Sequence, residues 1–141
     1  METAAADKVL RKYEKKYASS ISLFLSSKEG LEPQAAFDLL ALTLLPGSRV
    51  ESVFYVTLKT LNNYKRRNAY LNPSMSEKVL SIFALYKKGL TIFGSVREFN
   101  AWMAGPAYGL GGQKPDDLLD TMTGVSLIDE ELTRLEYGDL A

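Results

Sequence analysis

The side chains in this sequence that could perform acid–base or metal chemistry are carboxylates near its C-terminal end. The candidates are Asp116, Asp117, Asp120, Asp129, Glu130, Glu131 and Asp139. Clustered carboxylates can bind hard cations, but none of these follows the spacing of a calcium-binding loop. Asp116 and Asp117 fit the first turn of a helix, where the helix dipole favours anions, and residues 129–131 fit the solvated face of a last helix. The carboxylates therefore predict neither a catalytic residue nor a metal site.

Other catalytic chemistries are limited by the residue types that the sequence lacks. The 141 residues include no cysteine and no histidine. This excludes thiolate nucleophiles, disulfides, Ser-His-Asp triads and zinc sites built from either residue. The run Leu110-Gly111-Gly112 lacks the Lys-Ser/Thr pair of a phosphate-binding loop and follows no predicted strand. The sequence thus predicts a protein that is not an enzyme and that uses no cofactor.

Composition and charge indicate a globular protein with two different surfaces. Apolar residues make up 46% of the chain and charged residues 24%, as in ordinary folded domains. No apolar run reaches the length that crosses a bilayer, and the N-terminus lacks the pattern of a secretory signal. We therefore expect a cytoplasmic protein without a membrane partner. Residues 1–94 carry a net charge of +6 and residues 95–141 a net charge of −6, which indicates two different partners or an acidic helix that is simply solvated.

Hydrophobic periodicity predicts an all-α fold of about seven helices. Apolar residues recur at three- and four-residue steps, and the only segment that resembles a strand is the short run at 53–58. Longer helices are expected at residues 5–26, 33–45, 57–67, 74–93 and 124–137, with short helices at 49–54, after Ser95 and from Pro115. Ser48, Ser74 and Ser95 each precede a glutamate by three residues, as in a capping box, and Thr57 and Thr123 are placed as further N-caps.

The first predicted helix has an apolar stripe and a basic opposite face. The stripe consists of Val9, Leu10, Tyr13, Tyr17, Ile21 and Phe24, and the basic face of Lys8, Arg11, Lys12, Lys15 and Lys16. A stripe of this kind packs against other elements. The basic face is interpreted as solvated, with a contact to phosphate or to a membrane surface as the alternative.

The helix predicted at 57–67 is rich in lysine, arginine and asparagine. It follows the helix at 33–45 and a short helix at 49–54, which is the order of a helix-turn-helix motif whose last helix enters the major groove. Asparagine suits adenine, and arginine or lysine suits guanine or phosphate. The candidates for base contacts are Lys59, Thr60, Asn62 and Asn63, and those for phosphate contacts are Lys65, Arg66 and Arg67. The alternative is an exposed helix end whose cations suit the C-terminal dipole.

Three aromatic residues near turns and acids could anchor a protein partner. They are Trp102, Tyr108 and Tyr137, and aromatic side chains often dominate binding at protein interfaces. Core packing is the alternative, and it suits Trp102 better than the two tyrosines, which stand beside glycines.

The residues from 99 to the end form a long and specific motif. Its elements are Trp102-Met103, Pro106, Leu110-Gly111-Gly112, Pro115-Asp116-Asp117-Leu118-Leu119, Asp120-Thr121, Gly124 and Arg134-Leu135-Glu136-Tyr137-Gly138. This motif resembles the C-terminal toxin-binding domain of the Xre/MbcA/ParS antitoxins. The run at 57–61 is similar to the start of that family's recognition helix, with Lys59 in place of the usual arginine. The chain also departs from the family pattern at Ala107 and Asp116. In all, the resemblance covers about residues 30–141.

The resemblance implies an Xre-like helix-turn-helix region followed by a small helical toxin-binding domain. The expected division is residues 1–30 as a variable N-terminal helix, which serves in dimerisation or covers the core, 31–73 as the DNA-binding region, 74–94 as a connecting helix and 95–141 as the toxin-binding domain. The implied function is that of a type II antitoxin. Its partner would be a RES-domain toxin that consumes NAD or transfers ADP-ribose, and the antitoxin would block the active site of that toxin. As a homodimer it would bind operator DNA and repress its own operon.

The residues expected to bind the toxin follow from the same resemblance. They are Trp102, Tyr108, Leu110, Gly111, Gly112, Pro115, Asp116, Asp117, Asp120, Arg134, Tyr137 and Gly138. The loop at 105–115 is interpreted as a rigid plug, because glycines permit tight turns and prolines limit the unfolded chain. Its acidic neighbours could mimic nucleotide phosphates. Two other functions remain open at this stage: a transcription regulator whose C-terminal domain only dimerises, and an enzyme that uses carboxylates.

Overall fold

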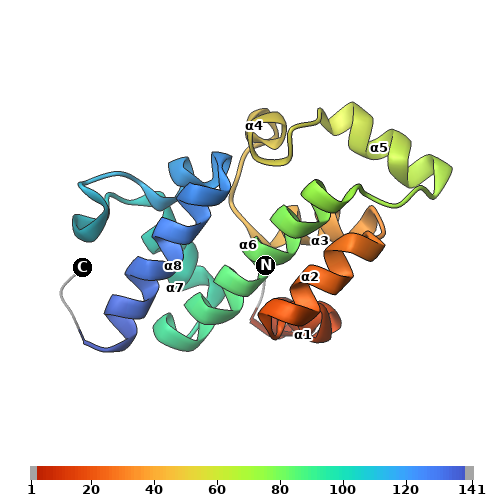
Figure 1. Ribbon diagram of the computed structural model, residues 1–141. Coiled ribbons are helices and arrows are strands. Elements are labelled where there is room, and N and C mark those ends of the chain that lie inside the picture. Colours follow the sequence, from red (N-terminus) through yellow and green to blue (C-terminus); the bar gives the residue numbers. More distant parts are fainter. Residues whose placement is uncertain (1–2, 139–141) are drawn as a thin grey trace. The chain divides into compact units, whose positions relative to one another are not determined.

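The computed structural model describes residues 3–138, and this part of the chain contains helices and no strand (Figure 1). The prediction of an all-α fold is therefore confirmed. The helices are α1 Thr3–Tyr17, α2 Ser20–Glu29, α3 Gln34–Leu42, η1 Gly47–Arg49, α4 Val50–Phe54, α5 Leu58–Arg67, α6 Pro73–Phe93, α7 Val96–Ala104, η2 Tyr108–Leu110, η3 Pro115–Asp120 and α8 Met122–Glu136, where η marks a 3₁₀ helix. Predictions that fall on residues 1–2 and 139–141, including Asp139, lie outside the described residues.

Two compact units make up the chain. Unit 1 comprises residues 1–84 and unit 2 residues 85–141, and α6 is the helix that runs through the boundary. The finer division into four parts stays a prediction.

The N-terminal helix α1 belongs to the core of unit 1. Leu10 is 1% exposed, and the rings of Tyr13 and Tyr17 stack on Phe83 of α6 with centroids 4.8 and 6.2 Å away. The Tyr17 hydroxyl donates to the Leu10 carbonyl at 2.7 Å, so the polar atom of this buried ring is satisfied. Of the two roles expected for this helix, covering the core is confirmed, and dimerisation stays a prediction.

The single helix predicted at 5–26 is wrong, because the chain forms two helices there. The break comes at Ser19, whose hydroxyl accepts the Ser22 N–H at 3.2 Å while the Ser22 hydroxyl accepts the Ser19 N–H. Serine competes with the helix for backbone hydrogen bonds, and here it starts α2 instead of continuing α1. The stripe is lost beyond the break: Ile21 and Phe24 are 63% and 56% exposed.

Two helix starts in unit 1 differ from the predicted capping boxes. The α6 helix starts at Asn72, whose side-chain oxygen accepts the Met75 N–H at 2.9 Å, so the predicted cap Ser74 lies inside the helix. Before α4, the chain forms η1, and the N-cap position falls not on Ser48 but on Arg49, whose side chain makes no capping hydrogen bond there.

Other caps compare as follows. Thr57 and Ser95 cap α5 and α7 as predicted, each accepting the N–H three residues ahead. The start of α8 is two residues earlier than expected: Thr121 accepts the Gly124 N–H at 3.0 Å, and the predicted cap Thr123 lies within the first turn.

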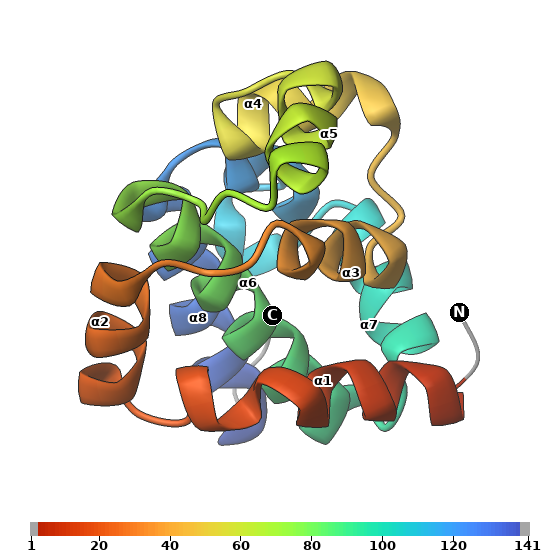
Figure 2. The ribbon, with the colours of Figure 1, turned by 90° about the vertical axis from the view of Figure 1, so that its right-hand side faces the viewer.

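Within unit 1, α5 and α1 lie at opposite sides. Figures 1 and 2 both show α5 above and α1 below, with α3 between them. A backbone hydrogen bond holds the segment after α5 to the segment before α3: the Leu71 N–H donates to the Leu31 carbonyl at 2.8 Å. Ser76 also joins them, accepting the Leu31 N–H at 3.0 Å. These hydrogen bonds tie the segment after α5 to the rest of unit 1 and so hold α5, with its exposed face, in place.

Asp38 on α3 connects that helix to α1. Its carboxylate accepts hydrogen bonds from the Tyr13 hydroxyl, from Lys12 at 3.2 Å and from Gln34 at 2.9 Å. Partial burial pushes the pKa of Asp38 upward, but these three donors outweigh it and hold the pKa below its usual value of 3.8. A carboxyl with a lowered folded pKa stabilises the fold above its unfolded pKa and loses that contribution as the pH falls through the folded value.

We expect Asp38→Asn to lower the free energy of unfolding by about 1 kcal/mol at pH 7. The reason is that the amide weakens the hydrogen bonds from Tyr13 and Lys12. Urea denaturation across pH checks this: the difference from wild type should shrink below the unfolded pKa of 3.8. A difference that stays constant into acid would contradict this account of the cluster.

Candidate functional site

The frame of unit 2 is a cluster of aromatic rings between α6 and α7. Phe99 packs edge-on against Tyr86 at 4.8 Å and lies 5.9 Å from both Phe93 and Trp102. Gly89 makes this possible, since a Cβ there would come within 2.4 Å of the Phe99 ring. Trp102, predicted as a toxin contact, is thus half-buried and belongs to this packing.

A buried hydrogen bond fixes the same pair of helices. The Tyr86 hydroxyl donates to Asn100 Oδ1 at 2.6 Å, and both residues are buried. Burial, with a contribution from Asp116, raises the pKa of Tyr86 above its usual range. The hydroxyl therefore stays protonated at neutral pH and keeps its hydrogen bond to Asn100 Oδ1.

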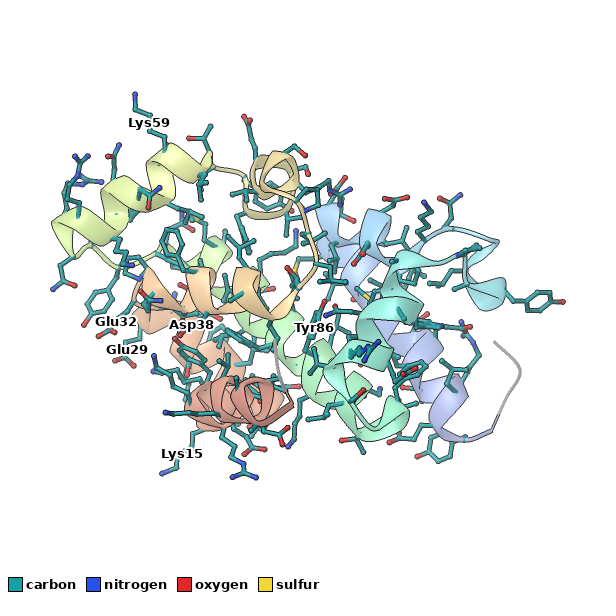
Figure 3. All side chains as sticks on the ribbon, turned by 180° about the vertical axis from the view of Figure 1, so that it is seen from behind. Lys15, Glu29, Glu32, Asp38, Lys59 and Tyr86 are labelled. Carbon is teal, nitrogen blue, oxygen red and sulfur yellow. The ribbon has the colours of Figure 1, made fainter. Side chains whose placement is uncertain are left out.

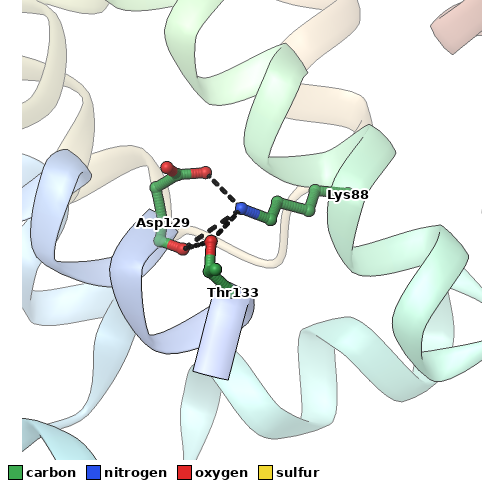
Figure 4. Close-up of polar contacts among 3 residues, drawn as sticks. All are labelled: Lys88, Asp129 and Thr133. Atoms are coloured by element: carbon green, nitrogen blue, oxygen red, sulfur yellow. Dashed lines mark hydrogen bonds and ion pairs between the residues drawn. The ribbon is translucent and has the colours of Figure 1, made fainter. Parts of the chain in front are cut away.

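Lys88 holds α8 against α6 (Figure 4). Its ammonium donates to Asp129 Oδ1 at 3.0 Å, to the Asp129 carbonyl at 3.3 Å and to Thr133 Oγ1 at 2.5 Å. Asp129, which the sequence assigned to a solvated face, keeps 54% of its side chain exposed but is anchored on one side. Partly exposed pairs of this kind contribute little stability, so the main consequence is the orientation of the last helix.

The loop after α7 is closed by its own backbone. The Ala107 N–H donates to the Gln113 carbonyl, and the Gly112 N–H donates to the Ala107 carbonyl, both at 3.0 Å. Gly111 and Gly112 have φ values of +66° and +80°, a region that side chains disfavour. These bonds make residues 107–113 a preformed loop. Its most exposed large hydrophobic side chain is Tyr108, at 81%.

The acidic turn η3 is packed tightly against the start of α8. Pro115 and Leu119 are buried, and a Cβ on Gly124 would lie 1.7 Å from the Leu118 carbonyl oxygen. Asp117 is exposed, while Asp116 and Asp120 are half-buried. The turn therefore presents a carboxylate surface on a rigid base.

Glu131 departs from the solvated role that the sequence predicted for it. Its side chain is fully buried, and its Oε1 accepts hydrogen bonds from Arg134 Nε and Nη2, both at 2.7 Å. The prediction was wrong because its neighbour in space is Gly109, whose missing side chain leaves room for a carboxylate under the loop.

The twelve residues expected to bind the toxin are not equivalent in the structure. Pro115 is buried, Trp102 packs on Phe99, and Arg134 pairs with Glu131 while keeping 43% of its side chain exposed. Six of the twelve are exposed: Tyr108, Gly111, Gly112, Asp117, Tyr137 and Gly138. Five are half-buried: Trp102, Leu110, Asp116, Asp120 and Arg134. Whether they contact a toxin stays a prediction.

The residues expected to bind DNA lie on α5 of unit 1. Leu61 is fully buried, and Leu58 is 42% exposed. A shallow hollow on this helix is lined by Leu58, Lys59, Asn62, Asn63 and Arg66. These positions share one face because they are three or four residues apart. Lys59 points away from unit 1 on the side opposite to Lys15 (Figure 3).

The other candidates on α5 are engaged in local contacts. Thr60 accepts the hydroxyl of the cap Thr57 at 3.1 Å. The Lys65 ammonium lies 5.1 Å from the centre of the Phe37 ring, and the Arg67 guanidinium lies 5.6 Å from that of Tyr64. Arg66 likewise donates to Asn63 Oδ1 on the same helix. The face at 59, 62, 63 and 66 is the better candidate for a partner because these four residues line one hollow.

A buried lysine positions the turn that leads into α5. Lys78 of α6 is 1% exposed, and its ammonium donates to the Val53 carbonyl at 2.9 Å and to the Tyr55 hydroxyl at 3.2 Å. Tyr55 has a positive φ of 65°, which is uncommon outside glycine. Lysine is almost never fully buried without partners, so Lys78 marks a turn with a fixed geometry. No sequence signal pointed to it.

Neither metal chemistry nor a membrane span finds support in residues 3–138. No group of three or more His, Cys, Asp or Glu side chains in that range could hold a metal ion. No single helix there is long and apolar enough to cross a membrane, and α6 and α7 reach that length and composition only as a bent pair.

Comparison with known proteins identifies the C-terminal unit. Residues 88–138 match the family model described as the antitoxin Xre/MbcA/ParS C-terminal toxin-binding domain. Residues 88–138 therefore belong to the family of Xre/MbcA/ParS C-terminal toxin-binding domains. A protein named Antitoxin Xre, from Yersinia enterocolitica serotype O:8, biotype 1B, is 25% identical to this chain over 95 residues. That match covers 67% of this chain and 64% of the relative.

The matched segment lies on the elements described above. It begins at Lys88, which holds α8, and ends at Gly138, so it contains α7, η2, η3 and α8. The membership predicted from the Trp102–Gly138 motif is confirmed. Antitoxins of this family are not enzymes, which agrees with the prediction for this chain. Sequence reasoning missed Lys88, Gly109 and Glu131, because their roles depend on contacts between separate elements.

Proposed function

We propose that this antitoxin belongs to a type II system and neutralises a RES-domain toxin, an enzyme that consumes NAD or transfers ADP-ribose. Unit 2 docks at the entrance of the toxin's active site and keeps NAD out. The proposal places the protein in the cytoplasm with its toxin. It is supported above all by the match of residues 88–138 to a toxin-binding domain. The closed loop at 107–113, with Tyr108 exposed at its tip, supplies a preformed contact.

The acidic surface of η3 supports the choice of a nucleotide-binding enzyme as the partner. A pocket that binds the phosphates of NAD is basic, and carboxylates set on a rigid turn can occupy it as phosphate mimics. Complementary charge also speeds association. Asp116, Asp117 and Asp120 stand on η3 above the buried Pro115 and Leu119, so binding orders few additional side chains.

Co-expression with the product of the neighbouring toxin gene tests the proposal. Cells that express the toxin alone should stop growing and lose NAD, and cells that also express the antitoxin should keep both. The purified complex should be stable and without NAD turnover. If the antitoxin copurifies with no toxin and cells are not protected, the proposed function is wrong, and a regulator whose C-terminal unit only dimerises becomes the better account.

Replacing Asp116, Asp117 and Asp120 together with asparagine should weaken toxin binding about tenfold at low salt, because complementary charges across an interface act chiefly on the association rate. Surface plasmon resonance at two salt concentrations measures this, and the loss should shrink at high salt. The matched control removes three exposed glutamates of unit 1: Glu29→Gln, Glu51→Gln and Glu77→Gln. Unchanged affinity of the aspartate variant at low salt would refute phosphate mimicry.

The second activity that we propose is repression of the antitoxin's own operon. The exposed face of α5 would enter the major groove of operator DNA, with Lys59, Asn62 and Asn63 toward the bases and Arg66 toward phosphate. Lys78 and Tyr55 fix the turn before α5. This fixed turn supports the proposal that α5 is a rigidly held recognition helix. We propose a homodimer, because α5 carries too few cations for tight binding by one copy.

A further inference from the structure

The Glu131 carboxylate, from α8, fills the space where a side chain on Gly109 of η2 would stand. A Cβ on Gly109 would lie 2.0 and 2.2 Å from the two carboxylate oxygens of Glu131 and 2.3 Å from its Cδ. Real Cβ atoms do not approach other atoms so closely, so any side chain at 109 displaces either the loop or the carboxylate. The φ of Gly109 is not positive, so contact with Glu131, and not backbone conformation, requires glycine here.

The carboxylate has little freedom to move away. Glu131 is 0% exposed, and Arg134 Nε and Nη2 hold its Oε1 at 2.7 Å. Its Oε2 has no hydrogen-bond partner among the described residues, an arrangement that is unfavourable for a buried charged group. A buried carboxylate with an unsatisfied oxygen adds little to stability. Its position under the loop therefore suggests a role other than stabilising the fold.

The loop that rests on this carboxylate presents one large side chain. Tyr108 precedes Gly109 in η2 and is 81% exposed, and the loop is closed on the other side by the hydrogen bonds of Ala107. Any shift of Gly109 is therefore passed to Tyr108. Exposed aromatic residues on rigid supports are typical anchors of protein interfaces.

We infer that the contact between Gly109 and the Glu131 carboxylate, which Arg134 holds in place, positions Tyr108 as a specificity-determining anchor for the toxin. The inference rests on the proposed function and adds the residues that set its geometry. The partner surface would be a pocket for a tyrosine ring beside the acidic patch of η3. Glu131 and Gly109 are positioning residues, because they act on the toxin through Tyr108.

A double-mutant cycle on the full-length antitoxin tests this with the purified toxin. Tyr108→Ala and Gly109→Ala should each lower toxin affinity at least tenfold, and the variant that carries both should bind no worse than either alone. Adding Glu131→Ala to Gly109→Ala should restore most of the affinity, since the smaller side chain makes room. Gly105→Ala is the matched control: its Cβ meets only the Ala101 carbonyl oxygen, at 3.7 Å, and affinity should not change.

Several results would overturn the inference. The inference fails if a folded Gly109→Ala variant binds the toxin with wild-type affinity. It also fails if the affinity losses of the two single variants add in the double variant, because the contact between Gly109 and Glu131 would then not act through Tyr108. Thermal unfolding of each variant separates binding from folding. If Gly109→Ala does not fold, Glu131→Gln, which keeps the volume, takes its place: its smaller loss of about threefold should vanish in the Tyr108→Ala background. A wild-type protein that binds no toxin would overturn the proposed function as well.

Discussion

Replacing Gly124 with alanine is expected to destabilise unit 2 strongly and to abolish protection against the toxin. The new Cβ would lie 1.7 Å from the Leu118 carbonyl oxygen and 2.7 Å from its carbonyl carbon. Both are backbone atoms, which cannot turn aside as a side chain does. The Gly124 N–H is also bonded to Thr121 at 3.0 Å, so the start of α8 cannot shift without losing its cap.

The magnitude follows from two opposing effects. Alanine favours a helix over glycine by about 1 kcal/mol, whereas overpacking a filled site costs about 3 kcal/mol. We therefore expect a net destabilisation of about 2 kcal/mol or more, measured by urea denaturation. Such a loss is a large part of the stability of a small unit, so growth of cells that express the toxin should no longer be rescued.

Gly105→Ala is the control for this prediction as well. It adds the same methyl group to unit 2, at a position with φ −109° and an ordinary contact of 3.7 Å. Stability and protection should match the wild type. If Gly124→Ala were more stable than the wild type, helix propensity would outweigh the clash, and the packing of η3 on α8 would have to be looser than described.

The triple variant Lys59→Ala, Asn62→Ala and Arg66→Ala is expected to abolish DNA binding without changing toxin binding. All three side chains line the hollow on α5 and none is needed for the buried face, which is formed by Leu61. Each direct contact to a base or phosphate contributes on the order of 1–3 kcal/mol, so affinity for the promoter fragment should fall at least about 100-fold. An electrophoretic mobility shift assay measures this.

Salt dependence gives a second measurement on the same variant. Loss of two cations should reduce the slope of log affinity against log salt by about 2, for each of the two copies of a dimer if both bind. The control removes two cations from the opposite side of unit 1, Arg11→Ala with Lys15→Ala, and it should still bind DNA. If the triple variant kept its shift and the control lost it, the basic face of α1 would be the DNA-binding surface.

The local sequence correctly predicted a helix start where only one residue nearby could serve as the N-cap. Thr57 and Ser95 cap their helices as expected, because each is the polar residue nearest to the start of an apolar repeat. Where several polar residues lie within one turn, the local signal does not select among them. Asn72 was used instead of Ser74, and Thr121 instead of Thr123, because packing of the helix decides which residue stands at its end.

Residue types and spacing determined three things by themselves: an all-α fold, the antitoxin family and the absence of nucleophiles that need cysteine or histidine. A motif such as Leu-Gly-Gly with Trp102 before it and Tyr137-Gly138 after it is carried by residue identities. It could therefore be read without knowledge of any contact, and the match at 88–138 agrees with it.

Only the tertiary structure decided which of these residues are buried and which are exposed. Sequence placed Glu131 among solvated acids, but the space left by Gly109, 22 positions earlier in the chain, buries it under the loop. It placed Pro115 among the toxin contacts, and the fold buries this residue at the start of η3. Burial depends on residues that are distant in sequence and adjacent in space, and the periodicity of one helix carries no information about them.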